Sequence, residues 1–136
     1  MLSSKQILLL EDDLVDVMTI KRGIAQLGIN NECVVKSNGE EGLEYLEACN
    51  ELPGIIFLDI NMPKMNGIEF LKQIKTNAKW AQIPVVVLTT SKDQQDKEDT
   101  FQLGIAGYMI KPVDYDEFKQ MLDAIMQYWK LSEHPY

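Results

Sequence analysis

The sequence predicts a doubly wound α/β fold, in which helices cover both faces of a five-stranded parallel sheet. Short apolar runs alternate with longer amphipathic segments five times along the 136 residues. The apolar runs show no polar alternation, which is typical of parallel strands that are buried on both faces. Crossovers between parallel strands are right-handed, so few topologies remain for this order of elements.

Five apolar runs mark the expected strands. The first and third are apolar throughout and end directly at acidic residues, which favours short buried strands. The second is weaker and leads into a Ser-Asn-Gly turn, and Pro53-Gly54 precedes the third. The expected strands span residues 7–10, 33–35, 55–58, 85–88 and 107–110.

Apolar residues at helical spacing mark five helices, expected at residues 14–27, 40–48, 68–75, 92–103 and from 115 to about 129. Gly28 is a stop signal for the first helix, and Asp114 can cap the last. In the first helix the apolar positions are Leu14, Val17, Met18, Ile24 and Leu27.

Length and composition predict a single domain over residues 1–136, with a core of about residues 5–130 and a short tail at 131–136. Acidic residues outnumber basic ones by 21 to 13, and no cluster of Lys and Arg occurs, which disfavours direct nucleic-acid binding. Two cysteines are too few for a disulfide scaffold or a zinc site. The chain shows no signal peptide and no stretch of about 18 apolar residues, which indicates a cytoplasmic protein with no membrane association.

Polar side chains follow the strands at the edge where ligands bind in parallel sheets, the carboxyl edge. Singly, each of these residues would be read as a turn, cap or solvated residue. Together they fall at the ends of four strands, which favours a shared site. They are Glu11, Asp12 and Asp13 after the first strand, Asp59 after the third, Thr89 at the end of the fourth and Lys111 after the fifth.

These residue types indicate phosphoryl chemistry with a divalent cation. Carboxylates that are forced together repel one another unless a cation lies between them. Oxygen ligands suit Mg²⁺, which also shares oxygens with phosphate. A carboxylate beside such an ion can act as a nucleophile toward a phosphoryl group, and Lys111 can stabilise the anion.

Four motifs in order resemble the response-regulator receiver domains of two-component signalling. They are LLLEDD at residues 8–13, LDINMPKMNG at 58–67, PVVVLT at 84–89 and GYMIKP at 107–112. The resemblance extends from about Ile7 to Trp129. It implies a flavodoxin-like fold with strand order 2-1-3-4-5.

The resemblance also implies a role for each residue of the acidic site. Asp59 is the phosphoacceptor. Asp12 binds Mg²⁺ directly and Glu11 assists, through water or directly, while Asp59 and the backbone carbonyl of Asn61 complete the protein's share of the metal site.

The resemblance further implies a switch beside the acceptor. Thr89 moves to hydrogen-bond the phosphoryl group, Tyr108 turns inward behind it, and Lys111 pairs with Asp59 or its phosphate. The peptide bond before Pro112 is expected to be cis. Thr90 stands where the family often has a smaller residue, so Thr90→Ala is expected to shorten the lifetime of the phosphate.

The function implied is that of a stand-alone response regulator, which takes a phosphoryl group from a sensor histidine kinase and signals by phosphorylation-dependent protein contacts. Residues 128–135 resemble single-domain regulators that serve bacterial phytochrome-type kinases. A homodimer through the fourth helix, fifth strand and fifth helix is a further expectation, with Tyr128 and Leu131 exposed near that contact. The domain assists its own phosphorylation and dephosphorylation but is not expected to be a conventional enzyme. His134, the only histidine, is expected in the solvated tail.

Three alternatives remain beside this function. A phospho-independent binding module of the same fold would not need Asp12, Asp59, Thr89 and Lys111 together. A phosphate-ester hydrolase would need a second carboxylate close behind Asp59 and a cap over the pocket. A flavin or nucleotide binder would need a glycine-rich phosphate loop, which the sequence does not contain.

Overall fold

The structure is a computed structural model that describes residues 5–136. Its strands form one parallel sheet in the order β2-β1-β3-β4-β5, which confirms the predicted topology. The strands are β1 (Ile7–Leu10), β2 (Cys33–Lys36), β3 (Ile55–Leu58), β4 (Val85–Thr89) and β5 (Gly107–Ile110). The helices are α1 (Leu14–Gln26), α2 (Gly39–Ala48), α3 (Gly67–Lys75), α4 (Gln94–Gln102) and α5 (Tyr115–Leu131), with a short 3₁₀ helix η2 (Trp80–Gln82) that was not predicted.

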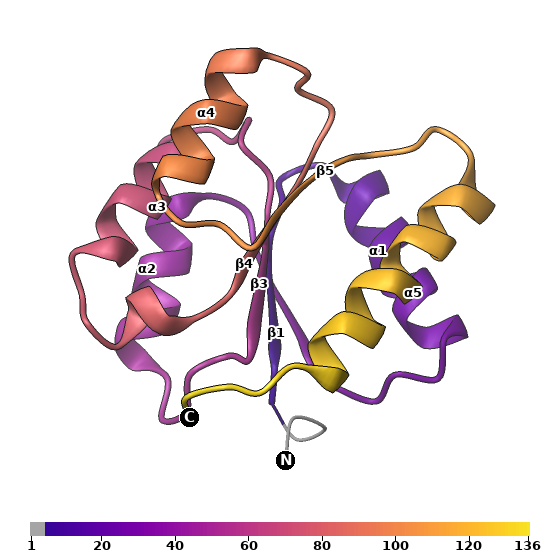
Figure 1. Cartoon of the computed structure of the whole chain (residues 1–136), viewed down its shortest axis with the longest axis horizontal. Coiled ribbons are helices and arrows are strands. Elements are labelled where there is room, and N and C mark those ends of the chain that lie inside the picture. The colour runs from indigo at the N-terminus through magenta and orange to yellow at the C-terminus, as the bar shows by residue number, and fades with distance from the viewer. Residues whose placement is uncertain (1–4) are drawn as a thin grey trace.

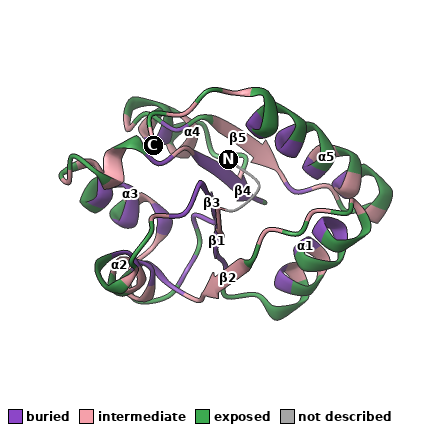
Figure 2. Cartoon of the chain, turned by 90° about the horizontal axis from the view of Figure 1, so that it is seen from below, coloured by how far each residue is buried: buried purple, intermediate pink, exposed green. Residues whose placement is uncertain are grey.

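Helices cover both faces of the sheet. Figure 1 shows α1 and α5 on one side and α2, α3 and α4 on the other. The strands β1, β3 and β4 are buried, whereas β2 and β5 at the two lateral edges are half-buried (Figure 2). Each face therefore has its own core, which explains why the central strands are apolar at every position except Thr89, the last residue of β4.

Alternate residues of β1 enter the two cores. Ile7 and Leu9 pack in the core that contains α1 and α5, while Leu8 and Leu10 pack in the core of the opposite face. Successive side chains of a strand point to opposite faces, so a four-residue strand supplies two residues to each core. No helix in the described part of the chain combines the length and apolar character needed to cross a lipid bilayer.

Of the five apolar positions predicted for the first helix, Val17, Ile24 and Leu27 pack toward the core and the other two do not. Val17, Ile20 and Ile24 face the core, but Leu14 and Met18 are 77% and 70% exposed. At about 100° per residue, Met18 falls on the opposite side of the helix from the buried stripe, and Leu14 falls well outside it. The two residues therefore form part of an exposed apolar surface.

Side-chain caps set where several helices begin. Asn38 accepts a hydrogen bond from the backbone N–H of Glu41 and starts α2 at Gly39, one residue before the predicted start. Asp93 accepts from the N–H groups of Gln95 and Asp96, so α4 begins two residues later than predicted. Such caps satisfy backbone donors that have no partner inside the helix.

The C-terminal tail folds back toward the amino edge of the sheet, where the strands begin. The Tyr136 hydroxyl donates to the Pro53 carbonyl at 3.0 Å, and Lys5 Nζ lies 4.9 Å from the centre of the Tyr136 ring. His134 Nε2 lies 3.2 Å from the Trp129 carbonyl, and this histidine is half-buried rather than fully solvated.

Candidate functional site

Four of the predicted site residues are buried at the carboxyl edge of the sheet. Glu11, Asp59, Thr89 and Lys111 are each less than one-tenth exposed. Backbone hydrogen bonds continue the sheet beyond the strands and fix these residues. Asp59 N–H donates to Leu10 O at 3.0 Å, and Lys111 N–H donates to Thr89 O at 2.9 Å.

The loop from Asp59 to Gly67 is held by a close backbone contact. Gly67 N–H donates to Ile60 O at 2.9 Å. A Cβ atom on Gly67 would lie 2.5 Å from the backbone oxygen of Asp59, so only glycine fits without moving the acceptor. Asn66 caps α3 in a capping box with Glu69, which fixes where the loop ends.

Three carboxylates form a candidate cation site. One oxygen each from Glu11, Asp12 and Asp59 lies within 4.8 Å of the other two. Two ligands on opposite sides of Mg²⁺ are about 4.2 Å apart, twice the metal–oxygen distance, so small movements would let one ion bind all three. The donor set, all hard oxygens with Asp12 exposed to solvent, fits an ion that retains water ligands. Asn61 is exposed two residues after Asp59, and metal binding by its carbonyl stays a prediction.

Lys111 does not pair most closely with Asp59. Its Nζ atom donates to Glu11 Oε1 and to Asp16 Oδ2, the latter at 2.8 Å, whereas Asp59 Oδ2 lies 3.8 Å away. Asp16 is not among the predicted site residues. The available signal was its position in the first turn of a helix that begins at the carboxyl edge.

Burial and nearby charges shift the pKa of Glu11 and of Lys111. Burial raises the pKa of Glu11 to about 7, and the charge of Asp59 adds to this effect, while Lys111 opposes it. Burial alone lowers the pKa of Lys111, but the hydrogen bonds to Asp16 and Glu11 and the negative charges of Asp59 and Glu11 together outweigh burial, so the pKa is raised overall. Lys111 therefore stays charged at neutral pH among carboxylates that outnumber it.

A chain of hydrogen bonds joins Thr89 to Tyr108. The N–H of Ser91 donates to Thr89 Oγ1 at 3.2 Å, and the Tyr108 hydroxyl donates to Ser91 O at 2.9 Å. Thr89 is fully buried and Tyr108 is half-buried. A displacement of Thr89 would therefore reach Tyr108 through one intervening residue. The movements of the two side chains stay predictions.

The prediction of a cis peptide bond before Pro112 is wrong. The described residues contain no cis peptide bond. The trans form of an X–Pro bond is favoured by about 0.5–1 kcal/mol where nothing opposes it. With the trans bond, Lys111 already reaches its carboxylate partners.

An exposed apolar surface lies on the first turns of α1, next to the acidic site. Leu14, Val15 and Met18 are each at least 70% exposed. Val113, which follows Lys111 and Pro112 at the same edge of the sheet, is fully exposed. Exposed apolar side chains that gather in this way are typical of protein-binding surfaces.

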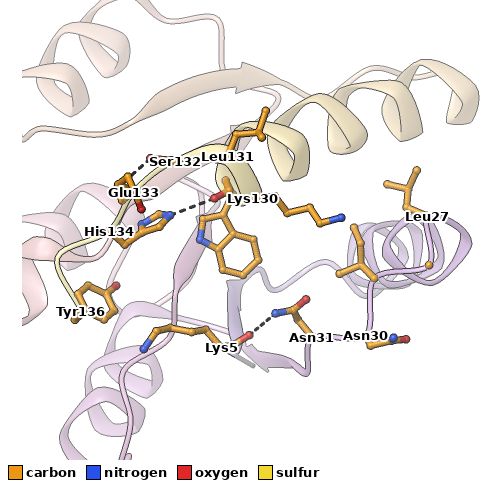
Figure 3. Close-up of a pocket in the computed structure, with 13 residues that line it drawn as sticks. Lys5, Leu27, Asn30, Asn31, Lys130, Leu131, Ser132, Glu133, His134 and Tyr136 are labelled. Carbon is orange, nitrogen blue, oxygen red and sulfur yellow. Dashed lines mark hydrogen bonds between the residues drawn. The ribbon is translucent and has the colours of Figure 1, made fainter. Parts of the chain in front are cut away.

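A cavity of about 860 Å³ lies away from this site, near the start of β1. Its walls come from Lys5, the α1–β2 connection at residues 27–31 and, near the C-terminus, residues 129–134 and Tyr136 (Figure 3). The Asn31 amide donates to Lys5 O at 2.7 Å across one side. None of the predicted site residues lines this cavity.

Comparison with known proteins agrees with the fold and the motifs. A model of the response regulator receiver domain matches residues 7–123. The probable methanogenesis regulatory protein FilR2 of Methanothrix harundinacea is 35% identical over 127 residues, covering 90% of this chain and 82% of that protein.

Two response regulators are similar to this chain in both sequence and structure. Response regulator Rcp1 of Synechocystis sp. is 32% identical over 130 residues, covering 92% of this chain and 88% of Rcp1. The structure of its Mn(2+)-bound form has a TM-score of 0.88 and covers 97% of this chain and 99% of that chain. The phosphorylated cyanobacterial phytochrome response regulator RcpA has a TM-score of 0.91 at 31% identity, covering 98% of this chain and 99% of that chain.

Proposed function

Because the chain belongs to the response regulator receiver family, we propose that Asp59 accepts a phosphoryl group from the phosphohistidine of a sensor histidine kinase. The observation that carries this proposal is the setting of Asp59. Its carboxylate lies with those of Glu11 and Asp12 in a candidate cation site, and the Lys111 ammonium lies 3.8 Å away. A nucleophilic oxygen, a place for a cation and a fixed positive charge are the parts that phosphoryl transfer requires.

We propose that the cation is Mg²⁺. Its protein ligands would be Glu11, Asp12, Asp59 and the backbone carbonyl of Asn61. When bound, Mg²⁺ supplies positive charge that offsets the negative charge on the transferring oxygens. An Asp59 oxygen attacks phosphorus, the phosphorus–nitrogen bond of the phosphohistidine breaks, and the imidazole nitrogen leaves with the electron pair. Lys111 then stabilises the new charge of about −2 on residue 59.

The exposed apolar residues of α1 are proposed as part of the kinase-docking surface. A phosphohistidine must approach Asp59 from the solvent at the carboxyl edge, and Leu14, Val15 and Met18 lie at that edge. Rcp1 and RcpA are similar over nearly their whole length, and RcpA is described as a phytochrome response regulator. A phytochrome-type kinase is therefore the proposed partner.

The output is proposed to be a change in protein contacts. Phosphate on Asp59 draws Thr89 toward it, and the hydrogen bonds through Ser91 transmit that movement to Tyr108. The surface formed by α4, β5 and α5 changes as a result, and Phe101, Tyr128 and Leu131 are exposed there or close by. We propose this surface as the site of a homodimer or downstream contact.

The remaining assignments follow from the same proposal. Residues 1–136 form a single receiver domain that acts in the cytoplasm, binds no nucleic acid directly and assists its own phosphorylation and dephosphorylation without being a conventional enzyme. Thr90 is exposed beside buried Thr89, and its replacement by Ala is expected to shorten the phosphate lifetime because water gains access.

The test is mass spectrometry after incubation with acetyl phosphate and Mg²⁺. Wild type should gain one phosphate, and omission of Mg²⁺ or the change Asp59→Asn should abolish the adduct. Asp116→Asn is the matched control, because it makes the same change of charge at an exposed position in the first turn of α5. This variant should be labelled like wild type.

A wild type that binds Mg²⁺ but gains no phosphate would contradict the proposal. That result would favour a phospho-independent binding module of the same fold.

A further inference from the structure

We propose that Asp16 is a positioning residue that holds Lys111 away from Asp59 until a phosphoryl group is present. This inference rests on the proposed function, because it concerns the charge that receives the phosphoryl group. It adds a residue that the receiver motifs of this sequence do not include.

The hydrogen bonds of Lys111 show how its ammonium is shared. An ammonium has three donors, and two of them are directed to Glu11 and Asp16. Asp59 lies 3.8 Å from Nζ, beyond hydrogen-bond distance. The acceptor carboxylate is therefore the least tightly held of the three that surround Lys111.

Asp16 differs from the other two carboxylates because it lies outside the cation site. The carboxylates grouped at that site are Glu11, Asp12 and Asp59. A cation bound there competes with Lys111 for Glu11, but not directly for Asp16. Asp16 can therefore retain Lys111 when the cation site is filled.

The position of Asp16 suits exchange of the ammonium. Its side chain is 31% exposed, whereas those of Lys111 and Glu11 are 6% and 2% exposed. Water can solvate Asp16 when Lys111 leaves, so breaking this pair costs less than breaking a fully buried one. Lys111 has to move about 1 Å to change from the 3.8 Å separation to hydrogen-bond distance from Asp59 or its phosphate.

Asp16 and Asp59 therefore compete for the ammonium of Lys111. The carboxylate of Asp59 carries one negative charge and loses the competition, whereas a phosphorylated Asp59 carries about two and wins it. Asp16 weakens the binding of any phosphoryl group by the free energy needed to release Lys111. It also keeps Lys111 from neutralising the nucleophile before the phosphoryl donor arrives.

The test measures the affinity of the Mg²⁺-loaded protein for beryllofluoride, which mimics a phosphoryl group on a carboxylate, by isothermal titration calorimetry. Asp16→Asn should bind about two- to five-fold more tightly than wild type, the range expected for loss of a partly exposed ion pair. Asp16→Glu keeps a carboxylate at this position and should bind beryllofluoride with an affinity closer to that of wild type than to that of Asp16→Asn. Asp116→Asn, an equal change of charge on α5, should bind like wild type.

A double-mutant cycle separates positioning from a general effect of charge. In the Lys111→Met background, Asp16→Asn should leave the affinity unchanged, because its effect acts through the ammonium. If Asp16→Asn binds no more tightly than wild type, or if the gain persists without Lys111, the inference is wrong while the proposed function stands. If wild type binds no beryllofluoride and gains no phosphate from acetyl phosphate, the proposed function fails and the inference fails with it.

Discussion

The two edges of the sheet are closed by different kinds of interaction. At the carboxyl edge, Glu11, Asp59 and Lys111 are buried together, and more carboxylates than cations meet there. At the amino edge, hydrogen bonds between neutral groups cross the ends of the strands, and the Lys5–Glu51 ion pair there is long, at 3.5 Å, with the Glu51 side chain 67% exposed. The Gly54 N–H donates to Gln6 O at 2.9 Å, and the Tyr136 hydroxyl donates to Pro53 O at 3.0 Å.

The difference separates the chemistry of the molecule from its stability. Buried carboxylates near one another lower the stability of the fold and raise a carboxyl pKa, as at Glu11. The same arrangement creates a place where a cation and a phosphoryl group bind favourably. Neutral hydrogen bonds at the amino edge stabilise the fold without such a cost. The effects of substitutions on stability should therefore differ between the two edges in size, in pH dependence and in response to Mg²⁺.

The largest loss of stability is expected for Lys111→Met at high pH. Loss of the ammonium leaves Glu11, Asp16 and Asp59 without their shared cation, and breaking a buried ion pair costs about 3 kcal/mol. The pKa of Glu11 should rise further, so the loss should be greatest near pH 8 and small near pH 4.5, where the carboxyl is protonated. Urea unfolding at both pH values measures it, and addition of Mg²⁺ should restore part of the stability. An equal loss at both pH values would contradict this explanation.

Gly67→Ala should have the next largest effect. The added Cβ atom would lie 2.5 Å from the backbone oxygen of Asp59, and overpacking of this kind costs about 2 kcal/mol. Displacement of Asp59 by this contact should also slow its phosphorylation by acetyl phosphate. Gly107→Ala is the matched control because a Cβ atom there has no neighbour within 4 Å. Similar unfolding midpoints and labelling rates for the two variants would show that the close contact does not position Asp59.

Glu11→Gln should stabilise the protein in the absence of divalent cations. The folded-state pKa of Glu11 is raised from an ordinary value of 4.5 to about 7. Wild type therefore loses stability as the pH rises between these two values, because the folded state resists losing the proton. Glutamine removes that dependence, so the variant should be about 1–2 kcal/mol more stable at pH 8 and little changed near pH 4.5. Urea unfolding in EDTA tests this, and a variant less stable than wild type at pH 8 would be the contrary result.

Tyr136→Phe should give the smallest effect and should not depend on the acidic site. The change removes the hydrogen bond to Pro53 O but keeps the ring beside Lys5, so we expect a loss of about 1 kcal/mol. Burial raises the pKa of Tyr136 to about 12, so the hydroxyl stays neutral between pH 5 and 9 and the loss should be constant over that range. Labelling of Asp59 should be unchanged. A change in labelling would indicate that the two edges are coupled.

Much of the fold was predictable from the sequence because its strands are short and the central ones, β1, β3 and β4, are apolar and buried on both faces. Such runs leave little doubt about their position, and the strand order followed from the family motifs. Exact helix ends were less predictable, since they depend on caps such as Asn38 and Asp93. The exposure of Leu14 and Met18 depends on the rotation of α1 against α5, which apolar spacing alone did not resolve.

The site was predictable only as far as the strand ends determine it. Asp59, Thr89 and Lys111 follow from parallel topology, but the pairing of Lys111 with Asp16 joins residues 95 positions apart. The return of Tyr136 to Pro53 likewise spans 83 positions. Contacts of this kind depend on the directions of side chains in the folded molecule. The expected cis bond before Pro112 came from resemblance alone, and the structure has the trans form.

The most direct test of the central claim locates the phosphoryl group. Protein treated with acetyl phosphate and Mg²⁺ is reduced with borohydride, which converts a phosphorylated aspartate to homoserine, and is then digested and sequenced by tandem mass spectrometry. We expect homoserine at position 59 alone, and none in the sample without Mg²⁺. Homoserine at position 12 or 16, or at no position despite bound Mg²⁺, would contradict the assignment of Asp59 as the phosphoacceptor.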